Sequence, residues 1–131
     1  MTIRISNTLQ NRVVDLFGSA FDAGKLRIYS GTQPASANSA ATGTLLAEIN
    51  LPIQAFQTST GGVAPLAGQW WTTALASGTA GWFRLTDRLA EANIDGSVTI
   101  TAGSGDLKLN SITITIGFVV EVTAFNLGTP I

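Results

Sequence analysis

Apolar residues near the start of the chain recur at helical spacing, three or four positions apart. The stripe consists of Leu9, Val13, Leu16, Phe17 and Phe21. Ser6 or Asn7 can cap the N-terminus of such a helix, and Gly24 can end it. The pattern predicts an amphipathic helix over residues 7–22, preceded by a short arm over residues 1–6.

From residue 25 onward the apolar period falls from about 3.6 to 2, which is typical of strands. Strands are predicted over residues 25–29, 44–49, 53–57, 69–74, 81–87, 94–101, 106–116 and 118–127. The strictest alternation lies at 112–116, where the isoleucines are predicted to fill the core. Residues 35–43 are small and polar and indicate a surface loop, while residues 102–105 indicate a tight connection.

About eight strands after a single helix predict a mainly β fold, an antiparallel β-sandwich or jelly-roll-like domain. Strands and helical patterns do not alternate, which disfavours a parallel α/β sheet. A length of 131 residues suits one hydrophobic core. The whole chain, residues 1–131, is therefore predicted to form a single domain.

Charged residues are scarce, at 11% of the chain against a usual share of about 25%. Seven basic and eight acidic residues give a net charge of −1, which favours a subunit of an assembly over a free monomer. The basic residues are scattered, so no nucleic-acid interface is expected. No apolar run is long enough to span a bilayer and no signal peptide is recognisable, so we expect synthesis in the cytoplasm and no membrane partner.

Catalytic chemistry has little support in the sequence. Histidine and cysteine are absent, which removes the commonest general base and the thiolate metal ligands. Asp87, Glu91 and Asp95 could supply a carboxylate pair, but acidic residues in a turn explain them better. The glycines at 61–62 and 103–105 lack the flanking residues of a phosphate-binding loop. The sequence predicts no enzyme, no catalytic residues, no cofactor and no metal site.

Aromatic residues occur as two adjacent pairs, Trp70-Trp71 and Trp82-Phe83. Neighbouring side chains of a strand point to opposite faces of its sheet, so one member of each pair should lie outside the core. That member could be covered by the helix or could contact a partner, since tryptophan is enriched at binding hot spots. Both interpretations remain open.

The N-terminal arm, residues 2–6, alternates apolar and polar side chains. Such an arm could add a strand to a neighbouring subunit, or it could pair within its own sheet. The candidate partner-binding residues are therefore Trp70, Trp71, Trp82, Ile3 and Ile5.

Several phrases in fixed order carry a resemblance that runs from about Asn7 to Phe125. They are LRIYSGTQPA (26–35), TLLAEI (44–49), SGTAGWFRL (77–85), DGSV (95–98) and DLKLNS (106–111). Together they resemble a family of small virion proteins encoded in the structural gene clusters of tailed bacteriophages. The resemblance implies a non-enzymatic structural protein of the virion and transfers no catalytic motif.

Among virion roles, the resemblance and the composition favour a capsid decoration or cement protein. Such a protein binds the major capsid protein, copies of itself, or both, as a homo-oligomer or as part of the lattice on the capsid surface. It stabilises the lattice by non-covalent contacts repeated by symmetry. A head-to-tail connector or tail component is an alternative, and a carbohydrate-binding β-sandwich module is a further one.

Overall fold

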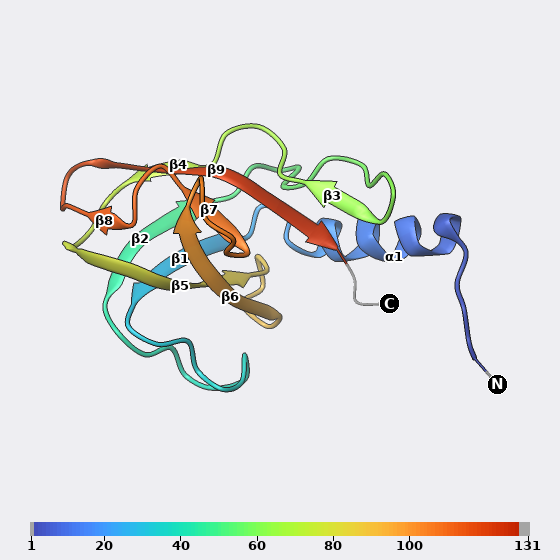
Figure 1. Ribbon diagram of the computed structural model, residues 1–131, viewed down its shortest axis with the longest axis horizontal. Coiled ribbons are helices and arrows are strands. Elements are labelled where there is room, and N and C mark those ends of the chain that lie inside the picture. Colours follow the sequence, from blue (N-terminus) through green and yellow to red (C-terminus); the bar gives the residue numbers. More distant parts are fainter. Residues whose placement is uncertain (1, 129–131) are drawn as a thin grey trace.

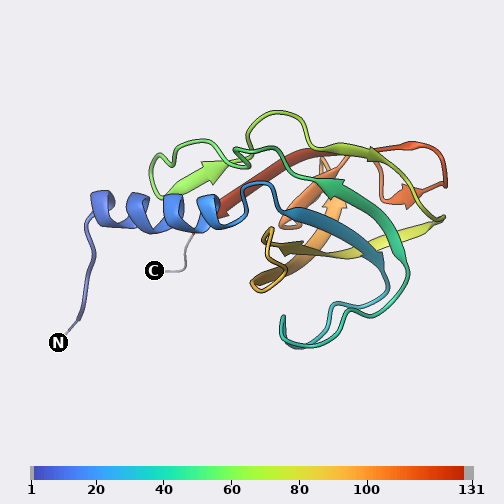
Figure 2. The same cartoon turned by 180° about the vertical axis from the view of Figure 1, so that it is seen from behind.

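The computed structural model describes residues 2–128 and confirms a mainly β fold with one N-terminal helix (Figure 1). Within these residues the helix is α1 (Asn7–Ala20), and nine strands form one curled, mixed sheet. The strands are β1 (Lys25–Ser30), β2 (Leu45–Asn50), β3 (Val63–Pro65), β4 (Trp71–Thr73), β5 (Gly78–Thr86), β6 (Asn93–Ile100), β7 (Leu107–Leu109), β8 (Thr113–Ile114) and β9 (Val119–Gly128). The curled sheet gives a β-sandwich-like body, from which the helix projects at one end (Figures 1 and 2).

The main path of the sheet runs β2-β1-β5-β6-β7-β9-β3. Strand β4 pairs with the first residues of β9, and β8 pairs with the start of β5. All these pairings are antiparallel except β6 with β7, where Val98 lies opposite Leu107. Parallel neighbours usually need a connection of about a dozen residues or more, but here residues 101–106 suffice. This connection is therefore tight, as its glycine-rich sequence indicated.

Aromatic side chains form the centre of the core. Trp70 lies edge-on to Phe56, with ring centroids 5.3 Å apart, and Phe125 lies 5.4 Å from Phe83 in a similar arrangement. Phe125 also contacts Trp70, so the four rings form one cluster between distant parts of the chain. Buried aliphatic residues from β1, β2 and β5 surround them, and in β1 these residues, Leu26 and Ile28, lie at the alternate positions that period-2 patterning predicts.

Two predicted strands are corrected by the structure. Residues 53–57 form no strand and contribute a single bridge, from Phe56 to Leu66. Residues 106–116 divide into β7 and β8, because the chain turns after β7 and Ser111 Oγ accepts a hydrogen bond from the Thr113 main-chain N–H. In the alternating segment Ile114 is buried as predicted, whereas Ile116 lies beside the turn at Gly117 and is exposed.

The helix begins where the sequence predicts and ends at Ala20, two residues earlier than expected. Ser6 is the N-cap, and its Oγ accepts a hydrogen bond from the Leu9 main-chain N–H at 3.1 Å. Gly24 follows the helix in a position where a Cβ would lie 2.3 Å from the carbonyl oxygen of Thr86. Only glycine fits this approach of the chain to β5, so Gly24 fixes how the helix joins the sheet.

Candidate functional site: protein-interaction surfaces

Helix α1 docks on the body through polar side chains. Asn11 Oδ1 accepts a hydrogen bond from the Gly62 main-chain N–H, and Asp15 Oδ1 accepts one from the Ser59 main-chain N–H, both at 2.8 Å. The Ser59 hydroxyl donates in turn to the Asn11 carbonyl oxygen at 2.9 Å. The helix residues buried in this contact are Val14 and Gly18. The docking face therefore satisfies main-chain donors of the loop that precedes β3.

The apolar stripe of the helix lies on the side opposite this docking face. A helix turns about once every 3.6 residues, so Leu9, Val13 and Leu16 are rotated by roughly half a turn from Asn11 and Asp15. Leu9 and Phe17 are more than 40% exposed and Leu16 is 72% exposed. Surface helices ordinarily turn such a stripe to the core, whereas here Leu9, Leu16 and Phe17 face outward. Phe21, the last residue of the predicted stripe, follows the end of the helix and is buried in the core. We call these residues, Leu9, Val13, Leu16 and Phe17, the helix stripe.

The N-terminal arm extends the helix stripe away from the body. None of the strand pairings of the described structure includes residues 2–6, so the arm does not join its own sheet. Ile3 is 88% exposed and Ile5 is exposed as well. Figures 1 and 2 both show the arm leaving the far end of α1. The candidate residues Ile3 and Ile5 are therefore accessible to a partner.

The helix stripe also borders a groove. Leu16 and Phe17 line a cavity of about 420 Å³ together with Ala92 and Ile94 at the start of β6. The residues around it are apolar except Ser19 and Asn93, so the groove extends the apolar surface from the helix onto the sheet.

The three tryptophans occupy different environments. Trp70 is fully buried in the aromatic core, while its neighbour Trp71 is 55% exposed, so this pair lies on opposite faces as predicted. Trp82 is also fully buried. The candidate role of Trp70 and Trp82 as partner contacts is therefore corrected, because neither side chain reaches the surface of this fold. Trp71 is the candidate tryptophan that a partner could contact.

Trp82 lies on the outer face of β5, where its own chain covers it. The Tyr29 ring stacks on it with centroids 4.6 Å apart, and the Arg84 guanidinium lies 5.4 Å from the indole centroid. Arg84 forms a bidentate pair with Asp95, at 2.7 and 2.9 Å. The helix is not what covers this aromatic, contrary to one of the two interpretations. We call Tyr29, Trp82, Arg84 and Asp95 the outer cluster.

The outer cluster also accounts for one of the candidate carboxylates. The side chain of Asp95 is 3% exposed and that of Arg84 is 9% exposed, so the pair is buried. The hydrogen bond to Asp95 raises the pKa of Arg84 above its ordinary value. Asp87 has another role, because its Oδ1 accepts from the Glu91 main-chain N–H at 2.8 Å and closes a turn. Asp87 thus has the turn role that the sequence predicted, whereas Asp95 lies in a strand and in a buried ion pair, which the sequence did not predict.

A second apolar surface lies at the opposite end of the molecule from the helix (Figure 1). Thr73 in β4 pairs with Val119 in β9, and the Ala74 main-chain N–H donates to the Phe118 carbonyl oxygen at 2.8 Å. These contacts bring together apolar side chains that are each more than half exposed. They are Trp71, Leu75, Ile116, Phe118 and Val119. We call this set the turn patch; the sequence indicated only its tryptophan.

Comparisons with protein families, with characterised proteins and with solved structures find no match for this chain. In residues 2–128, no helix is both long and apolar enough to cross a membrane. Over the same residues, no three acidic, histidine or cysteine side chains are grouped so that they could hold a metal ion.

Proposed function

We propose that this protein is a structural subunit that joins neighbouring protein subunits by burying its two apolar surfaces. The observation that carries the proposal is the orientation of α1, whose polar side chains bind the body while its helix stripe faces outward. Large exposed apolar patches on a soluble domain mark interaction sites. The family resemblance supports a more specific proposal, namely a capsid decoration or cement protein of a tailed bacteriophage.

The energetics favour burial of these surfaces in an assembly. Burying one leucine or phenylalanine side chain contributes about 1.5–3 kcal/mol, and each surface offers several such side chains. Association itself opposes part of this gain, so a single weak contact would be marginal and a repeated lattice contact would not. A net charge of −1 gives little repulsion between copies. Surfaces at opposite ends also allow one subunit to contact two neighbours.

Leu16→Glu is expected to reduce incorporation into the assembly at least about tenfold, which corresponds to about 1.4 kcal/mol. The substitution removes apolar area from the centre of the helix stripe and places a carboxylate in the contact. Because Leu16 is exposed, folding should be unaffected. The measurement is the occupancy of the protein on purified capsids, by quantitative mass spectrometry, with circular dichroism to check the fold.

Thr8→Glu is the matched control for Leu16→Glu. Thr8 is exposed on the same helix, outside the helix stripe and the groove, and the substitution introduces the same charge. Its occupancy should stay near that of the unsubstituted protein. Equal occupancy of both variants would mean that the helix stripe does not contact a partner.

Copy number separates the virion roles. A decoration protein should occur on the order of hundreds of copies per particle, in a fixed ratio to the major capsid protein, because each lattice position repeats the contact. A denaturing gel of purified particles measures this ratio. A ring of about a dozen copies would instead support a head-to-tail connector. Absence from the particle would contradict a virion role altogether.

A further inference from the structure

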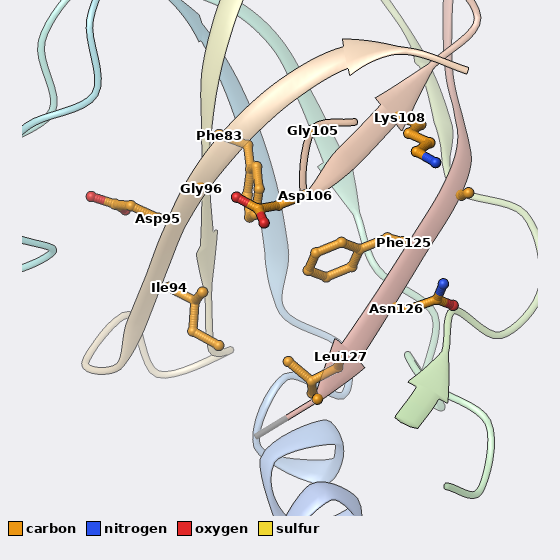
Figure 3. Close-up of a pocket in the computed structure, with 12 residues that line it drawn as sticks. Phe83, Ile94, Asp95, Gly96, Gly105, Asp106, Lys108, Phe125, Asn126 and Leu127 are labelled. Atoms are coloured by element: carbon orange, nitrogen blue, oxygen red, sulfur yellow. The ribbon is translucent and has the colours of Figure 1, made fainter. Parts of the chain in front are cut away.

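The sheet contains an open slot between β6 and β9. These strands are joined through β7, which pairs with β6 at residues 98–100 and with β9 at residues 122–125. Beyond β7 the start of β6 and the end of β9 are not paired with each other, and a cavity of about 340 Å³ lies between them. Figure 3 shows Phe83, Asp106 and Phe125 in this space, with Asp95 directed away from it. We call this space the slot.

Both edges of the slot present main-chain hydrogen-bonding groups. On β6, the Ser97 N–H donates to Asp106 Oδ2 at 3.0 Å, so it points away from β5. Because alternate residues of a strand point to the same side, the main-chain groups of Asp95 face the slot too. In residues 2–128, β6 pairs with β5 along one edge and with β7 only at 98–100 along the other. The slot edge of β6 is therefore unpaired at residues 93–96, whereas the Ser97 N–H is bound by the Asp106 carboxylate.

The end of β9 forms the facing edge. The Phe125 carbonyl oxygen accepts from the Leu66 main-chain N–H at 3.1 Å, on the side of β3. Alternation then places the main-chain groups of Asn126 and Gly128 on the slot side. An inserted strand would thus find hydrogen-bonding partners along both of its edges, as in strand addition to an open sheet.

We propose that the slot receives the N-terminal arm, residues 2–6, of a second copy of this chain. This inference rests on the proposed function, because it names one of the subunits that are joined. The arm is the right kind of segment: it is exposed and unpaired, and Ser6 at its end already has the extended conformation, with φ −74° and ψ 160°. Its five residues are enough to span the unpaired edge of β6, residues 93–96.

The side chains of the arm also fit the slot. Ile3 and Ile5 would lie on the inner face, where Phe83 and Phe125 form the floor of the slot. A Cβ at Gly96 would lie 2.6 Å from the Phe83 ring, so a glycine at this position lets the ring pack directly against β6. The burial of the two isoleucines would supply the apolar contribution to binding.

The charge of Arg4, the remaining large side chain of the arm, is complementary to a charge at the slot. With both isoleucines inward, Arg4 lies on the other side of the arm, and the exposed Asp106 carboxylate lies in the slot at its Ser97 end. Lys108 lies at the end of the slot that β7 closes. The Arg4 guanidinium and the Asp106 carboxylate are complementary, and Asp106 has one oxygen free of the Ser97 contacts.

The position of the arm indicates that the slot receives the arm of a second copy and not the arm of the same chain. The arm leaves α1 at the end remote from the body and continues outward (Figures 1 and 2). The groove beside the helix stripe and the slot share Ile94, so one continuous surface could hold both the arm and the first turns of the helix of a partner copy.

The test is a cysteine cross-link in the full chain, which has no cysteine of its own. Arg4→Cys combined with Asn126→Cys should form disulfide-linked dimers or larger species on a non-reducing gel after mild oxidation. Arg4→Cys combined with Asn50→Cys, at the far edge of the sheet on β2, is the control and should stay mostly monomeric. An intrachain disulfide that leaves only monomers would show the arm in its own slot and overturn the inference.

The second measurement is the molar mass of the protein in solution, which reports self-association. The unsubstituted chain should self-associate in light scattering, whereas deletion of residues 2–5 or the double change Ile3→Asp and Ile5→Asp should leave monomers. An unsubstituted chain that is monomeric up to about 1 mM would overturn the inference. If the arm variants keep their mass while Leu16→Glu still abolishes incorporation into capsids, the slot inference fails and the proposed function stands. If none of these variants has an effect, both fail.

Discussion

Trp70→Ala is expected to lower the free energy of unfolding by about 3–5 kcal/mol. Trp70 is fully buried, and its indole contacts Phe56 and Phe125 at centroid distances of 5.3 and 6.0 Å. Removing it leaves a cavity in the aromatic cluster that joins β9 to the loop before β3. The loss is a large part of the roughly 5–15 kcal/mol by which domains are stable. Urea unfolding followed by circular dichroism measures it.

Trp71→Ala is the control for this prediction. The two tryptophans are adjacent in the chain and are changed in the same way, but the Trp71 side chain is mostly exposed. Its replacement should change the free energy of unfolding by no more than about 1 kcal/mol. Equal losses for both variants would mean that the assignment of the two faces of β4 is wrong.

Asp95→Ala is expected to destabilise the protein by about 3–5 kcal/mol, because it leaves the buried Arg84 cation without its partner. Arg84 cannot escape this by losing its proton, since even an unshifted guanidinium stays charged at any pH at which the protein is folded. The Trp82 ring and the Tyr29 ring that stacks on it would also lose a fixed neighbour. The same urea titration measures the effect, and a loss below about 1 kcal/mol would contradict the burial of the pair.

Glu48→Gln provides the comparison for an exposed pair. Glu48 Oε1 lies 3.0 Å from Lys25 Nζ, and these side chains are partly exposed. The variant should lose at most about 1 kcal/mol. The hydrogen bond from Lys25 holds the pKa of Glu48 below its ordinary value of 4.5. The contribution of this pair is therefore present above that value and declines as the pH falls through the lowered pKa.

The fold class could be predicted because the period of the apolar residues changes sharply after α1. Ser6 marked the start of the helix through local chemistry, whereas Gly24, the predicted stop, lies in the connection to β1, four residues after the helix ends. The sequence could not show which side of the helix faces the body. That choice depends on the hydrogen bonds of Asn11 and Asp15 to a loop more than 40 residues away, and no local pattern reports such contacts.

The candidate surfaces could be predicted in part for the same reason. Alternation correctly placed Trp70 and Trp71 on opposite faces, but which of them lies inside depends on the pairing of β4 with β9. Trp82 is covered by Tyr29 and Arg84, which follow from the register of β1 with β5 and from the ion pair to Asp95. The slot follows from the early divergence of β6 and β9, which only the assembled sheet reveals.

Strand β9 pairs with β3, β4 and β7, yet it follows every one of them in the chain. During synthesis these three strands therefore emerge from the ribosome before the strand that they need, and their edges stay open until translation reaches residue 128. Contacts so distant in sequence form slowly compared with local ones. The pairings of β1, β2, β5 and β6 do not involve β9, so the part of the sheet around β9 is the part that must form last. The interval before β9 appears is when a chaperone would be most useful to the chain.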